Sequence, residues 1–223
     1  MYIILLMDNT NISLTAVIRE VAFTNKSDII ENLGYVKDDD LRNSSDLRNG
    51  DAVVYVDKRI QSALVILPGA DPGEYIKDKN FIEIINIFNV IDYLKYKITS
   101  YEKCIEEVIK KYSEYTIIFF GHSIGGFMIN LKLQDSKYNC YTYNPCFINK
   151  QSSENIRNYR TNGDILSLGL IGKETETVNL DCLDGLIKFQ FNIIYFLYEL
   201  HTTTIFTIYP DKSIIITIPC YKA

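Results

Sequence analysis

The sequence has no tryptophan, only two histidines, and few residues that break regular structure. Its 223 residues include five prolines and eleven glycines, against 47% hydrophobic residues. This composition excludes disordered, collagen-like and mucin-like chains. Basic residues are also scarce, because 23 Lys and Arg stand against 28 Asp and Glu and give a formal net charge of −5. A nucleic-acid partner requires a basic face, so we expect none.

Cysteine and histidine are too sparsely placed for a common metal site. The five cysteines include no pair with C-x-x-C spacing, which argues against a zinc cage and a thioredoxin-like redox site. We therefore expect no bound metal, and reduced thiols that are mostly buried, in a cytoplasmic compartment. The cysteines are Cys104, Cys140, Cys146, Cys182 and Cys220.

Long hydrophobic runs are missing as well. The N-terminal apolar run is seven residues long and lacks the basic region and the small-residue cleavage site of a signal peptide. The apolar stretch Gly185–Leu200 is interrupted by polar residues, so we predict no transmembrane segment. The length fits a single domain over residues 1–223.

Hydrophobic periodicity predicts strands that alternate with helices. This alternation is typical of an α/β fold, a mostly parallel sheet with helices on both faces. We expect residues 38–50 to form a charged loop. The predicted helices are Ile12–Phe23, a short helix from Asp28 that stops at Gly34, Tyr101–Tyr112 with Thr99 and Glu102 as its capping box, Gly125–Leu133 and Asp184–Leu200. The predicted strands are Ala52–Val56, Ser62–Leu67, Phe81–Ile87, Thr116–Phe120, Cys140–Tyr143, Ile156–Arg160, and a closing hairpin of Thr203–Tyr209 with Ser213–Ile218.

The strongest functional signal is a G-x-S-x-G motif centred on Ser123. It directly follows the apolar strand Thr116–Phe120 and opens the helix Gly125–Leu133. A nucleophile elbow needs this strand, sharp turn and helix, because the turn exposes the serine hydroxyl above the sheet. The alternative is a glycine-rich turn that binds phosphate, but no lysine follows the glycines and G-x-G-x-x-G is absent. We predict that Ser123 is a nucleophile in a fold of the α/β-hydrolase type.

A serine nucleophile needs a base, and the chain has two candidates. His122 is next to Ser123 at a strand end, so its side chain should point to the other face. This leaves His201 as the predicted base, although it could also be a surface histidine that ends a helix.

The acid of an α/β-hydrolase triad comes between the serine and the histidine in the chain. Asp164 lies in the loop after the strand Ile156–Arg160, beside a glycine, and is our candidate. Asp181 and Asp184 are alternatives, but they lie at the start of a predicted helix, where capping would explain them.

Two backbone N–H groups should form the oxyanion hole. One belongs to Ile124, the residue after the nucleophile, and the other to the loop after the strand Ser62–Leu67. Pro68 has no N–H, which leaves Gly69 or Ala70, and we choose Ala70.

At this point the chain resembles the class 3, or fungal-type, lipases. Four segments match in order, and His201 follows a predicted helix as the histidine of that family does. The resemblance implies a lipase or esterase that acts on acylglycerols or other lipid esters through Ser123, Asp164 and His201, without a cofactor. It also implies a lipid or small ester as the partner and peripheral contact with a lipid surface. The matching segments are Asp51–Ala70, Glu106–Gly126, Cys140–Pro145 and Asn158–Leu168.

The chain departs from the lipase pattern at four places. Pro68 and Ala70 replace Arg and Thr or Ser of the oxyanion loop, and Asn144 replaces a glycine. The segment Asp71–Lys79, at the position of the lid, is polar. Two alternatives therefore remain open. One is a phospholipase A1 or acyltransferase on the same triad, and the other is a lipase-like binding or signalling module without turnover.

Overall fold

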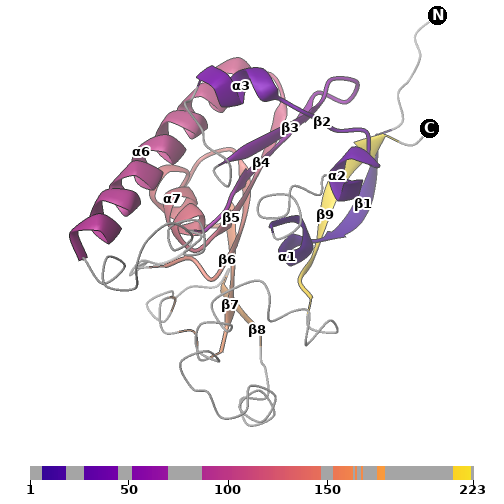
Figure 1. The fold of residues 1–223 in the computed structure, drawn as a ribbon. Coiled ribbons are helices and arrows are strands. Elements are labelled where there is room, and N and C mark those ends of the chain that lie inside the picture. The colour runs from indigo at the N-terminus through magenta and orange to yellow at the C-terminus, as the bar shows by residue number, and fades with distance from the viewer. Residues whose placement is uncertain are drawn as a thin grey trace, which may run out of the picture.

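A seven-stranded sheet lies at the centre of the molecule (Figure 1). The computed structural model describes residues 7–18, 28–44, 52–69, 87–146, 153–162, 164, 167, 175–178 and 213–221. The strands, in their order across the sheet, are β2 (Val36–Lys37), β3 (Val53–Asp57), β4 (Ser62–Leu67), β5 (Thr116–His122), β6 (Asn139–Tyr143), β7 (Ile156–Thr161) and β8 (Thr175–Val178). Neighbours are antiparallel from β2 to β4 and parallel from β4 to β8. The predicted mostly parallel sheet is confirmed.

The middle strands of the sheet correspond to the apolar runs of the sequence. Six of the seven residues of β5 are buried, as are all six of β4, which is the pattern of strands covered on both faces. The predictions for β3 to β7 are therefore confirmed within one or two residues. β8 was missed, because its sequence Thr-Glu-Thr-Val has no apolar run. Residues 81–86 of the predicted strand Phe81–Ile87 lie outside the described residues, and Ile87 is helical instead. The first strand of the closing hairpin and the predicted helix Asp184–Leu200 also lie outside the described residues.

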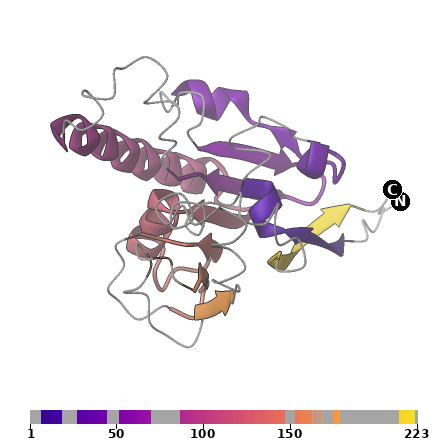
Figure 2. The ribbon, with the colours of Figure 1, turned by 60° about the horizontal axis from the view of Figure 1, so that its bottom comes forward.

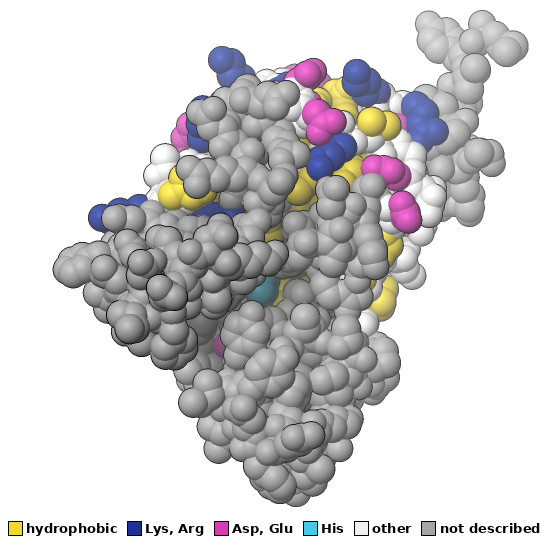
Figure 3. Space-filling view, viewed as in Figure 1, with side chains coloured by type: hydrophobic (Ala, Val, Ile, Leu, Met, Phe, Trp, Pro, Cys, Tyr) yellow, Lys and Arg dark blue, Asp and Glu magenta, His cyan; other side chains and the backbone are white. Residues whose placement is uncertain are grey.

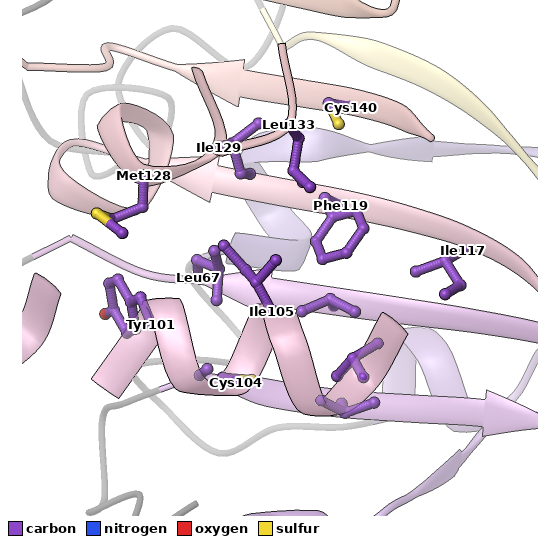
Figure 4. Close-up of a cluster of buried hydrophobic side chains, with 14 of the residues drawn as sticks. Leu67, Tyr101, Cys104, Ile105, Ile117, Phe119, Met128, Ile129, Leu133 and Cys140 are labelled. Carbon is purple, nitrogen blue, oxygen red and sulfur yellow. The ribbon is translucent and has the colours of Figure 1, made fainter. Parts of the chain in front are cut away.

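One face of the sheet is covered by helices α3 (Asp39–Ser44), α6 (Ile87–Lys111) and α7 (Ile124–Lys132). Figures 1 and 2 show α6 and α7 packed side by side against the strands. Figure 4 shows the core between them, to which Ile105 of α6, Phe119 of β5 and Met128 of α7 all contribute. The buried residues of α6 recur every three or four positions, as in an amphipathic helix. The hydrophobic ones are Tyr101, Cys104, Ile105 and Val108, and Lys97 and Ser100 are buried as well.

The other face carries a small two-stranded antiparallel sheet, β1 (Met7–Ser13) with β9 (Ile215–Tyr221), and the short helices α1 (Leu14–Ala16) and α2 (Asp28–Glu31). Tyr35 attaches this layer to the main sheet, because its hydroxyl bonds both the Ser62 hydroxyl, at 2.9 Å, and the Pro219 carbonyl, at 2.8 Å. Helices thus lie on both faces, as predicted.

Three predictions of secondary structure are wrong. Residues 12 and 13 belong to β1 rather than to a helix, since pairing with β9 at the other end of the chain outweighs their helical spacing. Residues 39–44 of the predicted loop form α3, and Asp38 caps it by accepting a hydrogen bond from the Leu41 N–H at 3.1 Å. α6 begins at residue 87, so Thr99 does not cap it but bonds the Lys95 carbonyl within the helix, at 3.0 Å.

Strand register brings the carboxyl ends of β4 to β7 to one edge of the sheet. Leu67 of β4 pairs with Gly121 of β5, His122 with Tyr143 of β6, and Tyr143 with Tyr159 of β7. In open α/β sheets ligands bind outside the carboxyl ends of the strands, so a functional site is expected at this edge.

Candidate active site

Ser123 forms the whole connection between β5 and α7. The strand ends at His122 and the helix begins at Ile124, and Ser123 has φ 52° and ψ −117°. Residues other than glycine rarely adopt this backbone conformation. It costs about 1–3 kcal/mol and persists only where surrounding contacts hold it. Three hydrogen bonds do so here. The Ser123 N–H donates to the Tyr143 carbonyl at 3.2 Å, and the Ser123 carbonyl accepts from the N–H of Phe127 at 2.9 Å and of Cys146 at 3.2 Å.

Gly125 lets the helix after Ser123 approach the sheet. A Cβ atom at Gly125 would lie 2.0 Å from the carbonyl oxygen of Leu67 in β4, closer than real Cβ contacts allow. The second glycine of the motif is thus needed for space. This close approach places the first turn of α7 directly beside the end of β4.

The loop after β4 passes beside Ser123. A Cβ atom at Gly69 would lie 2.9 Å from the Ser123 Cβ and 2.7 Å from Nδ1 of His122. The preceding carbonyl, of Pro68, accepts a hydrogen bond from the buried Tyr101 hydroxyl of α6 at 2.7 Å. The backbone predicted to supply the second oxyanion N–H therefore reaches the proposed nucleophile. Ala70 itself lies outside the described residues.

His122 is buried in the sheet edge. Its ring stacks on that of Tyr143 in β6, with the centroids 5.7 Å apart and the planes at 18°. His201, the predicted base, lies outside the described residues, as do Asp181 and Asp184. Its role stays a prediction.

Asp164 lies just beyond β7 and is buried, with 2% of its surface exposed. Its N–H donates to the Thr161 carbonyl at 3.2 Å, and its own carbonyl accepts from the Ser167 hydroxyl at 3.4 Å. Two short turns therefore hold the predicted acid at the same sheet edge as Ser123.

Cys146 interacts with both the predicted nucleophile and the predicted acid. The pKa of its thiol is raised to about 11, chiefly by burial and to a smaller extent by the Asp164 carboxylate, while a hydrogen bond with the Ser123 side chain lowers it. The thiol thus hydrogen-bonds with Ser123 and interacts electrostatically with Asp164. Sequence reasoning missed this residue, although it directly follows the segment Cys140–Pro145 that carries part of the lipase resemblance.

Comparison with solved structures finds fungal lipases. The Lip2 lipase of Yarrowia lipolytica has a TM-score of 0.35 and 16% identity, over 59% of this chain and 61% of that one. The lipase of Rhizopus microsporus var. chinensis has a TM-score of 0.35 and 11% identity, over 70% of this chain and 64% of the other. The Rhizomucor miehei lipase in its propeptide complex has a TM-score of 0.29 and 16% identity, over 52% of this chain and 46% of that lipase.

No family model matches the chain, and no curated protein does. The three lipases have TM-scores of 0.35 and below, which are too low to assign a function. The function therefore depends on the residues of this chain. The fold itself is evident from the topology. A mostly parallel sheet with helices on both faces, and a serine on a sharp turn between β5 and α7, give an α/β fold of the α/β-hydrolase type.

Within the described ranges, no three His, Cys, Asp or Glu side chains lie close enough together to hold a metal ion. Basic and acidic side chains are interspersed on the described part of the face in Figure 3. None of the helices in the described part of the chain is long and apolar enough to cross a membrane.

Proposed function

We propose that the protein is a serine carboxylic-ester hydrolase, a lipase or esterase acting on lipid or small esters. The Ser123 hydroxyl attacks the ester carbonyl, and His201 takes its proton and returns it to the leaving alcohol. Asp164 orients His201, while the N–H groups of Ile124 and Ala70 stabilise the oxyanion. The mechanism requires no cofactor.

The conformation of Ser123 is the observation that carries this proposal. A serine that served only to connect β5 and α7 would gain nothing from φ 52°, ψ −117°, since a glycine would adopt it at lower cost. A nucleophile gains exposure above the sheet edge. The three backbone hydrogen bonds hold the main chain of Ser123, and its side chain hydrogen-bonds with the thiol of Cys146.

The surroundings of Ser123 also suit the charge that develops in ester hydrolysis. Ile124 begins α7, a helix of nine residues, and the first N–H groups of a helix have no intrahelical acceptor. These groups and the helix dipole favour negative charge at the helix N-terminus. The close approach of Gly69 brings a second stretch of backbone beside Ser123. An oxyanion formed at the carbonyl would lie between the two.

A fluorophosphonate probe tests the nucleophile directly, because it forms a stable bond with an activated serine hydroxyl. We expect covalent labelling of the full chain, with the adduct on the peptide that contains Ser123 by mass spectrometry, and no labelling of Ser123→Ala. A matched control is Ser136→Ala, which removes a hydroxyl from a loop away from the sheet edge and should label like the wild type. Absence of labelling in a folded wild-type protein would favour a lipase-like module without turnover.

The substrate class follows from the polar segment at the lid position. A lid that opens on a lipid surface must bury apolar area, and residues 71–79 offer Tyr75 and Ile76 among three acids and two lysines. We predict faster turnover of soluble, short-to-medium-chain p-nitrophenyl esters than of emulsified long-chain triglyceride. Rates on tributyrin should show no jump at its solubility limit. A sharp rise there would instead identify an interfacially activated lipase, and transfer to an added alcohol in place of water would identify an acyltransferase.

A further inference from the structure

The end of β6 is hydrogen-bonded to the residue that follows β5. The Tyr143 carbonyl accepts from the Ser123 N–H at 3.2 Å, and the Cys146 N–H donates to the Ser123 carbonyl at 3.2 Å. Residues 143–146 therefore hold the main chain of the proposed nucleophile on both sides.

The same segment is bonded to the end of β7 through Thr161. The Thr161 N–H donates to Oδ1 of Asn144 at 2.8 Å, and Nδ2 of Asn144 donates to the Thr161 hydroxyl at 3.3 Å. The Tyr143 hydroxyl lies 2.6 Å from the Thr161 hydroxyl and also bonds the Asn144 side chain. All three residues are buried.

Thr161 in turn holds the proposed acid. Its carbonyl accepts the hydrogen bond from the Asp164 N–H at 3.2 Å, which closes the turn after β7. The Asp164 carboxylate is near enough to Tyr143 to add to the rise in the pKa of that phenol, which burial chiefly causes. One buried network, Tyr143–Asn144–Thr161, thus runs from the backbone of Ser123 to the backbone of Asp164.

Asn144 shows that the network is a specific arrangement rather than a generic strand end. Its φ is 43°, a conformation that glycine adopts without cost and asparagine adopts more readily than most residues. Glycine would satisfy the backbone here but would provide neither side-chain bond to Thr161. The two side-chain hydrogen bonds of Asn144 to Thr161 therefore offset the cost of its strained backbone.

We infer that Thr161 is a positioning residue, which sets the Asp164 carboxylate relative to Ser123 through the side chains of Tyr143 and Asn144. This inference rests on the proposed function. A triad requires its members to be held within about 0.5 Å of the productive geometry, and a displacement of about 1 Å can lower the rate about 100-fold. Loss of the Thr161 hydroxyl removes a buried partner from both Tyr143 and Asn144, and the turn that carries Asp164 moves with it.

Thr161→Val against Thr161→Ser tests this, since valine keeps the shape and removes the hydroxyl while serine keeps the hydroxyl. We expect Thr161→Val to lower kcat by about 10-fold per fluorophosphonate-labelled site, with KM little changed, and Thr161→Ser to stay within about 2-fold of the wild type. Counting sites by labelling removes any loss that comes from unfolded protein.

A double-mutant cycle with Asp164→Asn shows whether Thr161 acts through the acid. Positioning predicts that Thr161→Val has little further effect on kcat once Asp164 is replaced, because coupled residues are not additive. Thr142→Val is the matched control. It removes an equally buried hydroxyl on the neighbouring strand, one that bonds Asn158 rather than the Thr161 network, so its effect should be the same fold-change in both backgrounds.

The outcomes separate this inference from the proposed function. If Asp164→Asn loses activity but Thr161→Val does not, or if Thr161→Val has the same fold-effect in both backgrounds, Thr161 has no positioning role. If Asp164→Asn keeps activity while Ser123→Ala loses it, the acid of the proposed function is wrong, and the inference falls with it. Should Thr161→Val fail to fold, Tyr143→Phe removes one hydrogen bond of the same network, and we expect a loss of about 3-fold with the same dependence on Asp164.

Discussion

We expect replacement of Ser123 by alanine to lower kcat for ester hydrolysis by roughly 10³-fold or more and to leave the protein folded. The hydroxyl is the proposed attacking group, so the rate that remains should come from binding and the proposed oxyanion hole alone. The fold survives because alanine makes the same backbone hydrogen bonds to Tyr143, Phe127 and Cys146. The check is steady-state kinetics on a p-nitrophenyl ester beside a circular dichroism spectrum.

The other proposed triad residues should behave as one unit with Ser123. We expect His201→Ala and Asp164→Asn each to lose roughly 10³-fold, and a triple variant to lose little more, because the members of a triad are strongly non-additive. His122→Ala is the control for His201→Ala, and its catalytic loss should be far smaller. Near-full activity of Asp164→Asn would move the acid to Asp181 or Asp184.

The strand, turn and helix around Ser123 were predictable because all their parts are adjacent in the sequence. The apolar run Thr116–Phe120 is bounded by turn residues, and the glycines, serine and helical spacing follow within a few positions. Local sequence therefore determined both the strand and the helix, and the structure adds the reason for the second glycine in the contact between Gly125 and Leu67. The middle strands were predictable for the same reason, since burial on both faces gives continuous apolar runs.

The parts that the sequence did not reveal depend on contacts between distant residues. β1 forms because its residues pair with β9 some 200 positions later, as between Thr10 and Ile218, and local periodicity does not contain that partner. The hydrogen bonds of Tyr143 and Asn144 with Thr161 likewise exist only after strand order and register are fixed. The interaction of Cys146 with Asp164 could not be predicted for the same reason, since it depends on β6 lying between β5 and β7.

The second large effect is expected at Gly125. In an ordinary helix interior, replacing glycine by alanine stabilises a protein by up to about 1 kcal/mol. Here the added Cβ would lie 2.0 Å from the Leu67 carbonyl oxygen and 2.6 Å from its carbonyl carbon, and neither backbone atom can rotate away. α7 and β4 must separate, which breaks the packing of the core between them. We expect Gly125→Ala to lower the free energy of unfolding by about 3 kcal/mol, the cost of forcing extra volume into a packed interior.

Urea denaturation followed by circular dichroism measures this change, with Leu131→Ala as the control in the same helix. Leu131 is 46% exposed, so its replacement should change the free energy of unfolding by no more than about 0.5 kcal/mol. Activity should follow the geometry, since Leu67 directly precedes the Pro68–Gly69 backbone beside Ser123, and any separation of α7 from β4 moves the two proposed oxyanion donors apart. Gly125→Ala should therefore lose hydrolysis even where it remains folded at low temperature. A Gly125→Ala protein as stable and as active as the wild type would contradict the close approach of helix and strand on which the proposed oxyanion hole depends.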